Sequence, residues 1–103
     1  LKEADGKLWA GCFFGNVYIG GNAVLNGTAT GWPDFVLAAD YELQNFDARL
    51  SEMLAPGNLP FLPSASDIEK SGLHVMDILR GLTRHIEELY LYIGEMRNDT
   101  GKI

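Results

Sequence analysis

The sequence has one cysteine, no cluster of basic residues and no long apolar run. Since Cys12 has no second cysteine to pair with, no disulfide can form within the chain. The eight Lys and Arg residues are scattered and the formal net charge is −6, which argues against a nucleic-acid partner and against an anionic membrane surface. No apolar run is long enough for a transmembrane helix, so we predict no membrane insertion.

The residue patterns of an enzyme are also missing. His74 and His85 are about 16 Å apart along a helix, too far to share a metal ion within one chain. A phosphate-binding P-loop would need Lys at Gly21 and Ser or Thr at Asn22. Cys12 lies in an apolar stretch, which favours packing over reactivity. We therefore predict a protein that is not an enzyme, with no catalytic residues, no metal site and no cofactor.

What is present is an ordinary globular composition in a chain of single-domain size. The 103 residues are 47% hydrophobic and 21% charged. The first residue is Leu1 rather than Met, so we expect the chain to be a piece of a longer protein. We divide it into a β-rich stalk end (residues 1–31), a connecting segment (32–72) and a C-terminal coiled-coil helix with a tail (73–103).

The N-terminal part predicts short strands near residues 7–14, 16–19 and 22–30, because it is rich in Val, Ile, Phe and Tyr and punctuated by Gly. Two or three such strands are not stable alone and need another layer or another copy of the chain. Residues 19–24 and 25–30 also match the hexapeptide repeat of left-handed β-helix acyltransferases. The matching residues would form only about one coil of such a solenoid, which needs several coils to bury its core. A fragment of an acyltransferase is therefore our third hypothesis, after the two given below.

The connecting segment predicts a short helix over residues 46–54, capped by Asn45. The sequence LPFLP then predicts an extended, proline-rich strap. Ser66 and Glu69 have the spacing of a capping box, which predicts a further turn of helix that Gly72 ends.

From about Leu73 to Asn98 the apolar residues follow an unbroken heptad pattern, which predicts a helix about 33 Å long. They are spaced alternately four and three residues apart and occupy the a and d positions: Val75, Leu79, Leu82, Ile86, Leu89, Ile93 and Met96. Arg84 with Glu87 and Glu88 predicts a solvated outer face, and Leu91 falls outside the heptad seam, where it could anchor the helix to its own chain.

The heptad pattern predicts self-association. Ile at a with Leu at d is typical of parallel dimers, but the apolar flanks, which include Ile78 and Tyr92 at g, indicate a wider seam. We therefore expect a parallel homotrimer first and a dimer second. The fold class predicted from the sequence is α+β, with N-terminal stalk strands, a small helix, a strap and a long coiled-coil helix.

From Trp32 onward the sequence resembles a domain found at the C-terminal end of phage tail-fibre and bacterial adhesin-like surface proteins. The residues that carry the resemblance are Trp32–Val36, Asp40-Tyr41 with Leu43, Leu59-Pro60 with Leu62–Ala65, Gly72-Leu73, Ile86–Leu89 and Leu91–Ile93. One departure is Phe61, where the family usually has a small residue. The similarity to the intramolecular chaperones of phage tailspikes is looser, and the Ser of their self-cleavage site is absent from LKEADGK at the start of this chain.

The resemblance implies a C-terminal unit that brings three chains together in a virion tail fibre or on a bacterial or other extracellular surface. A fibre tip that binds a host receptor or glycan is the alternative function. Aromatic side chains stack on sugars, and the candidates for this contact are Trp9, Trp32, Tyr18 and Tyr41.

Overall fold

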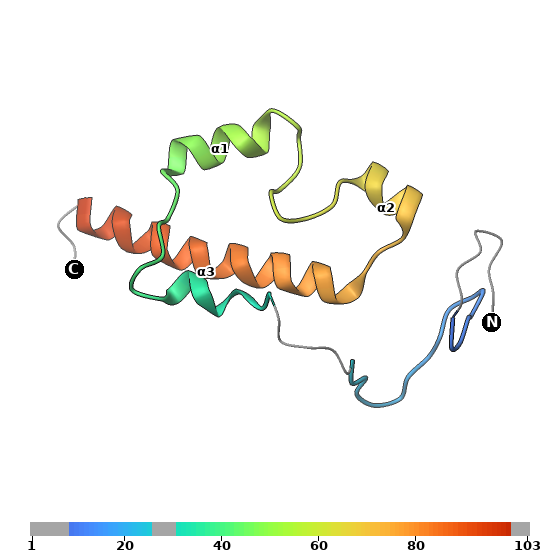
Figure 1. Ribbon diagram of the computed structural model, residues 1–103. Coiled ribbons are helices and arrows are strands. Elements are labelled where there is room, and N and C mark those ends of the chain that lie inside the picture. Colours follow the sequence, from blue (N-terminus) through green and yellow to red (C-terminus); the bar gives the residue numbers. More distant parts are fainter. Residues whose placement is uncertain (1–8, 26–30, 100–103) are drawn as a thin grey trace.

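The computed structural model describes residues 9–25 and 31–99, and the regular elements in them are helical (Figure 1). In chain order they are the 3-10 helix η1 (Pro33–Leu37), α1 (Phe46–Leu54), α2 (Ala65–Ser71) and α3 (Val75–Asp99). The long helix α3 is the axis of the fold. The segments carrying η1 and α1 lie along its flanks, and α2 lies towards its N-terminal end (Figure 1).

The predicted α+β class with an N-terminal β-stalk is wrong. Residues 9–25 contain no strand, although they cover most of the three predicted ones, and residues 1–8 and 26–30 lie outside the described part. The apolar alternation of this stretch is real, but a strand is stable only when a neighbour satisfies its backbone hydrogen bonds. Within the described residues this chain supplies no such neighbour.

The short helix η1 places two apolar residues against α3. Pro33 stands at its start, where the fixed φ of proline suits a helix and its missing N–H costs nothing. Pro33 and Val36 are both buried. After η1, Ala38 N–H donates to the carbonyl of Phe35 and Tyr41 N–H donates to the carbonyl of Ala38, which turns the chain back towards α3.

Helix α1 confirms its prediction. It runs from Phe46 to Leu54, and the Asn45 side chain accepts a hydrogen bond from Ala48 N–H, as expected of a helix N-cap. Helix α2 is present and ends before Gly72 as predicted, but the predicted capping box is wrong. Ser64 and Asp67 form it, two residues earlier than Ser66 and Glu69. Both pairs have the same spacing, so the pattern alone does not choose between them.

The strap between α1 and α2 crosses α3 closely at Gly81. A Cβ atom on Gly81 would lie 2.5 Å from Leu62 Cδ2 and 2.6 Å from the carbonyl oxygen of Phe61. Phe61 has a φ of 65°, in the left-handed region that is costly for a residue with a side chain. The His85 ring, one turn along α3, shares a hydrogen bond with the carbonyl of Pro60 and so holds the strap in place.

The buried core of the described residues is small and partly charged. Its members are Pro33, Val36, Arg49, Gly81, Glu88 and Tyr92. Since apolar burial is the main favourable term in folding, so small a core leaves little stability to a single copy. Many large apolar side chains are exposed instead.

We predict that Gly81→Ala destabilises the fold by about 1–3 kcal/mol, because the added methyl group would collide with backbone as well as side-chain atoms. The matched control is Gly94→Ala on the same helix, where a Cβ meets nothing within 4 Å. There the better helix propensity of Ala should stabilise the chain by about 0.5–1 kcal/mol. Urea unfolding at one fixed protein concentration measures both, and equal effects of the two substitutions would contradict the close approach.

Candidate self-association surface

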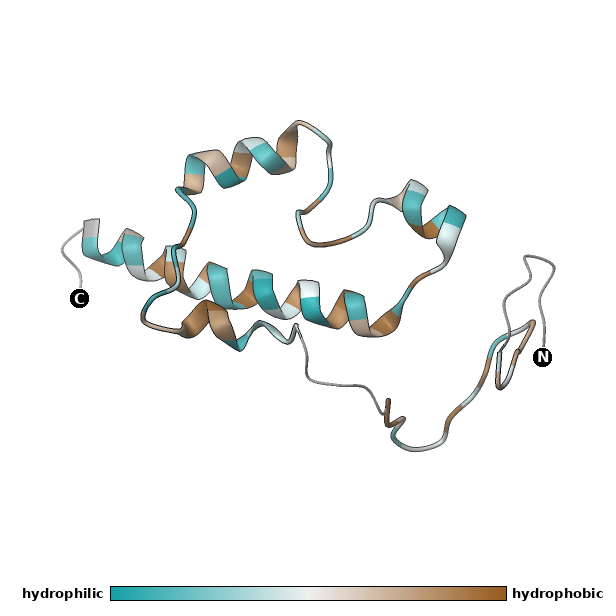
Figure 2. Ribbon diagram, viewed as in Figure 1, coloured by the Kyte–Doolittle hydropathy of each residue, from teal (hydrophilic) through white to brown (hydrophobic). Residues whose placement is uncertain are grey.

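The heptad stripe of α3 is on the outside of the chain. Its seven a and d side chains, from Val75 to Met96, are 42% to 65% exposed. Apolar residues recur along the whole of α3 between polar ones (Figure 2). A contiguous apolar face of this length is unusual on a monomer, which makes the stripe a candidate interaction surface.

The chain's own segments cover the other side of α3. The α3 residues that are fully buried are Gly81 and Glu88 at c and Tyr92 at g. The prediction that Arg84, Glu87 and Glu88 form a solvated outer face is therefore wrong. The segments η1, α1 and the strap pack against that face of α3. They leave the a and d positions uncovered.

A carboxylate organises this buried side. Glu88 is 2% exposed, and its Oε2 lies 3.0 Å from Nη2 of Arg49 on α1. The same oxygen accepts a hydrogen bond from the Tyr41 hydroxyl, and Nε of Arg84 lies 3.8 Å from it. A buried charge is costly unless it is paired and hydrogen-bonded, and here two guanidinium groups and a phenol meet that need.

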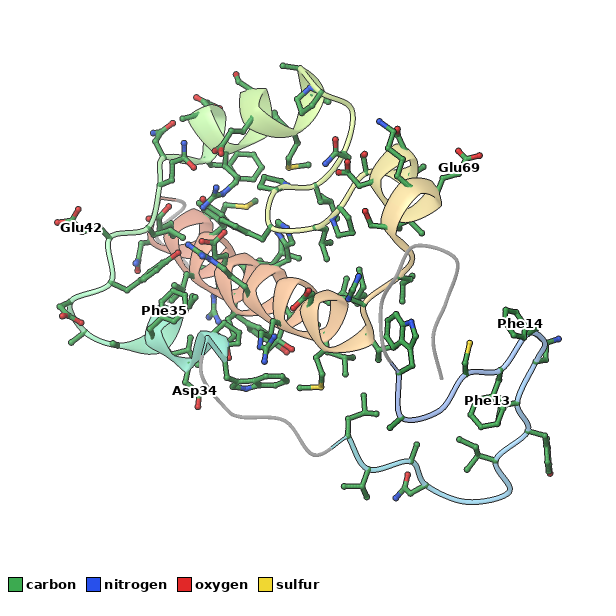
Figure 3. The ribbon with its side chains drawn as sticks, turned by 45° about the vertical axis from the view of Figure 1, so that its right-hand side comes forward. Phe13, Phe14, Asp34, Phe35, Glu42 and Glu69 are labelled. Carbon is green, nitrogen blue, oxygen red and sulfur yellow. The ribbon has the colours of Figure 1, made fainter. Side chains whose placement is uncertain are left out.

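Aromatic rings surround the two guanidinium groups. The Phe61 ring centroid is 3.7 Å from the Arg84 guanidinium carbon and 4.8 Å from that of Arg49, so one ring contacts both cations. Phe35, on η1 (Figure 3), lies 5.0 Å from the same Arg84 atom. These cation–π contacts connect the strap and η1 to the group formed by Glu88, Arg49, Arg84 and Tyr41, which we call the Glu88 cluster.

Tyr92, one of the two predicted g-position interface residues, is engaged within its own chain. It is 6% exposed, its hydroxyl donates to the carbonyl of Gln44 at 2.7 Å, and its ring meets Phe46 edge-on at 5.1 Å. Ile78, the other, is half-buried. The a and d residues and Ile78 thus remain candidates for contact with another copy, while Tyr92 supports α1.

The predicted glycan-contact residues come from two separate parts of the chain. Trp9 and Tyr18 belong to the N-terminal segment, which also displays Phe13 and Phe14 away from the helices (Figure 3). Trp32 precedes η1 and is half-buried, and the Tyr41 hydroxyl is committed to Glu88 and Arg84. A sugar-stacking role for Tyr41 would compete with the cluster that holds the fold, and the glycan hypothesis stays a prediction.

The described residues contain neither a metal-site cluster nor a helix that could span a membrane. Nowhere in residues 9–25 and 31–99 do three or more His, Cys, Asp or Glu side chains gather as a metal site would require. Over the same ranges, no helix combines the length and the apolar character needed to cross a bilayer. Residues 19–24, the first of the two acyltransferase-like hexads, form no strand, and most of the second lies outside the described part.

Comparison of the chain with models of protein families, with curated proteins and with solved structures finds no match.

The cluster of Glu88 with Arg49, Arg84 and Tyr41 was not predicted from the sequence. A signal was available, because Gly81, Arg84, Glu88, Leu91 and Tyr92 recur at the three- and four-residue spacing of a second helical face. Because this face carries the charged residues Arg84 and Glu88, it was predicted to be exposed to solvent. Only a partner cation on another element, Arg49, turns it into a buried one.

We predict that Glu88→Ala lowers the free energy of unfolding by about 3–5 kcal/mol, because it removes the buried counterion of Arg49 and leaves only the half-exposed Glu52 beside it. The control is Glu52→Ala, which removes a second, half-exposed carboxylate 3.1 Å from the same arginine and should cost less than about 1 kcal/mol. If Glu88→Ala leaves too little folded protein to measure, the isosteric Glu88→Gln should give a smaller loss in the same urea titration. Similar losses from Glu52→Ala and both Glu88 variants would contradict the central role of Glu88.

The two engaged tyrosines predict a loss of stability at alkaline pH. Burial raises the pKa of Tyr41, with the hydrogen bond to Glu88 adding to it, and burial also raises the pKa of Tyr92. A folded-state pKa above the unfolded value contributes stability that is complete below about pH 10 and is lost as the pH rises through the folded-state pKa.

Unfolding titrations across this pH range should therefore show stability falling above about pH 10. Tyr41→Phe should make the fall shallower, whereas Tyr18→Phe should leave it unchanged because Tyr18 is 93% exposed. An alkaline profile that Tyr41→Phe does not alter would contradict this assignment.

Proposed function

We propose that this chain is a non-enzymatic trimerisation and assembly domain at the C-terminal end of a phage tail fibre or a bacterial surface adhesin. The observation that carries the proposal is the uncovered heptad stripe of α3. The segments η1, α1 and the strap lie on other sides of α3, so most of the stripe remains uncovered and available to other copies.

The energetics of the stripe support association. Full burial of an aliphatic side chain contributes about 1.5–3 kcal/mol, so covering the exposed half contributes about 1 kcal/mol for each of the stripe residues. The stripe as a whole then contributes about 7 kcal/mol per copy, against a cost of association of about 4–15 kcal/mol. The a and d residues therefore bring association within reach, and contacts on their flanks decide how tight it is.

The parallel homotrimer is the assembly we favour, with a dimer as the alternative. Tyr90, at the e position beside the stripe, is 71% exposed, so the associating face is broader than a two-stranded seam requires. The setting in a fibre or adhesin is supported by the resemblance from Trp32 onward. The motifs of that resemblance overlap both features of the structure. They include Tyr41 and Glu88 of the Glu88 cluster and Ile86, Leu89 and Ile93 of the stripe.

Solution mass tests the proposal. Sedimentation equilibrium of the chain at micromolar concentration should give three times the monomer mass. Ile86→Asp should dissociate the copies, because it would bury one carboxylate from each of them at the seam. Gly94→Asp is the matched control: it adds the same charge to α3 at an open position outside the stripe and should leave the trimer intact.

A monomeric wild-type chain would remove the proposal. A dimer would support the alternative assembly instead. Equal dissociation by Ile86→Asp and Gly94→Asp would show that net charge, rather than the stripe, governs association.

A further inference from the structure

A groove between α1 and α3 opens beside the heptad stripe. Its volume is about 230 Å³, and its apolar walls include Phe46, Leu50 and Met53 from α1, Leu59 from the strap, and Leu89 and Tyr92 from α3. Leu89 belongs to both surfaces, because it lines the groove and occupies a d position of the stripe. The groove is thus a lateral extension of the surface proposed to join the copies.

The chemistry of the groove selects an apolar occupant. The charged residues that line it are Arg49 and Glu88, which are buried and paired with each other at 3.0 Å. They are committed to each other, so they give a charged ligand little to bind. An aromatic or aliphatic side chain fits the remaining walls, and the size is sufficient, since a cavity of about 150 Å³ lined by such residues accepts benzene.

The heptad register identifies which side chain would reach the groove. In a parallel, in-register coiled coil, the g residue of one helix faces the e residue of the following heptad on its neighbour. The α3 residues that line the groove include His85 and Tyr92, both at g. The e residue five positions after His85 is Tyr90, which is 71% exposed in its own chain.

We propose that Tyr90 of one copy inserts into the groove between α1 and α3 of the next copy. This inference rests on the proposed parallel assembly and deepens it. It makes α1 part of the interface, and it adds the flank burial that the stripe requires. The amphipathic ring suits the position, because its apolar face fills the groove while its hydroxyl can stay at the solvent edge.

A double-mutant cycle tests the contact in the full chain. Tyr90→Ala should raise the concentration at which the copies half-dissociate by about tenfold or more, as expected of a buried aromatic anchor. Leu50→Ala, on the α1 wall, should also weaken association. In the double variant, the rise in the half-dissociation concentration should be smaller than the product of the two single rises by about threefold or more. Tyr18→Ala, which removes another exposed tyrosine, outside α3, is the control and should have no effect.

A disulfide provides the second measurement. In a Cys12→Ser background, Tyr90→Cys combined with Leu50→Cys should give covalently linked dimers and trimers on oxidation, and either cysteine alone should not. The e position faces away from α1 within one chain, so a link between these two positions joins different copies.

The outcomes separate the two proposals. A wild-type chain that associates, with independent effects of Tyr90→Ala and Leu50→Ala and no disulfide between the two cysteines, overturns the groove contact and leaves the assembly standing. A wild-type chain that is monomeric overturns both.

Discussion

The buried carboxylate of Glu88 is the constraint on which the rest of the structure depends. Two segments that are distant in sequence converge on it, the loop after η1 through Tyr41 and α1 through Arg49, and Arg84 joins them from the preceding turn of α3. The strap joins the same cluster because the Phe61 ring contacts both guanidinium groups. That contact helps to offset the left-handed backbone of Phe61, which would otherwise cost about 1–2 kcal/mol. The contacts of Glu88 and its partners thus hold the loop after η1, α1 and the strap on one side of α3.

This choice of side explains why the core is so small. The residues gathered around Glu88 bring charge and aromatic rings into the interior, whereas the aliphatic residues of α3 point away from it. A buried ion cluster contributes less stability than well-packed apolar residues of the same volume. The apolar surface that would normally stabilise a domain of this size is instead displayed on the stripe and around the groove at Leu89. Folding of one copy and the proposed association of several copies would thus draw on different faces of the same helix.

The helices could be predicted from the sequence because their signals are local. Asn45 caps α1, and the heptad spacing extends through α3, so the bounds of both helices agree closely with the predictions. The N-terminal strands could not be judged in this way. Their stability depends on a partner strand, which periodicity cannot supply. The Glu88 cluster could not be predicted from the sequence for a related reason. Whether an acidic residue on a helix is solvated or buried depends on a cation elsewhere in the chain, here 39 residues away on α1.

In the proposed assembly, the division of α3 into a polar inner side and an apolar outer side would also provide specificity. Apolar contact has little directionality, so a helix that was apolar all round could associate through any face or register. Because Glu88, Arg49, Arg84 and Tyr41 need one another, the inner side admits only one arrangement of η1, α1 and the strap. That arrangement sets α1 beside the g positions and so fixes where the groove lies relative to the stripe. In a parallel assembly an e-position residue of the neighbour is then the one that meets the groove, and a shifted or antiparallel register would lose that fit.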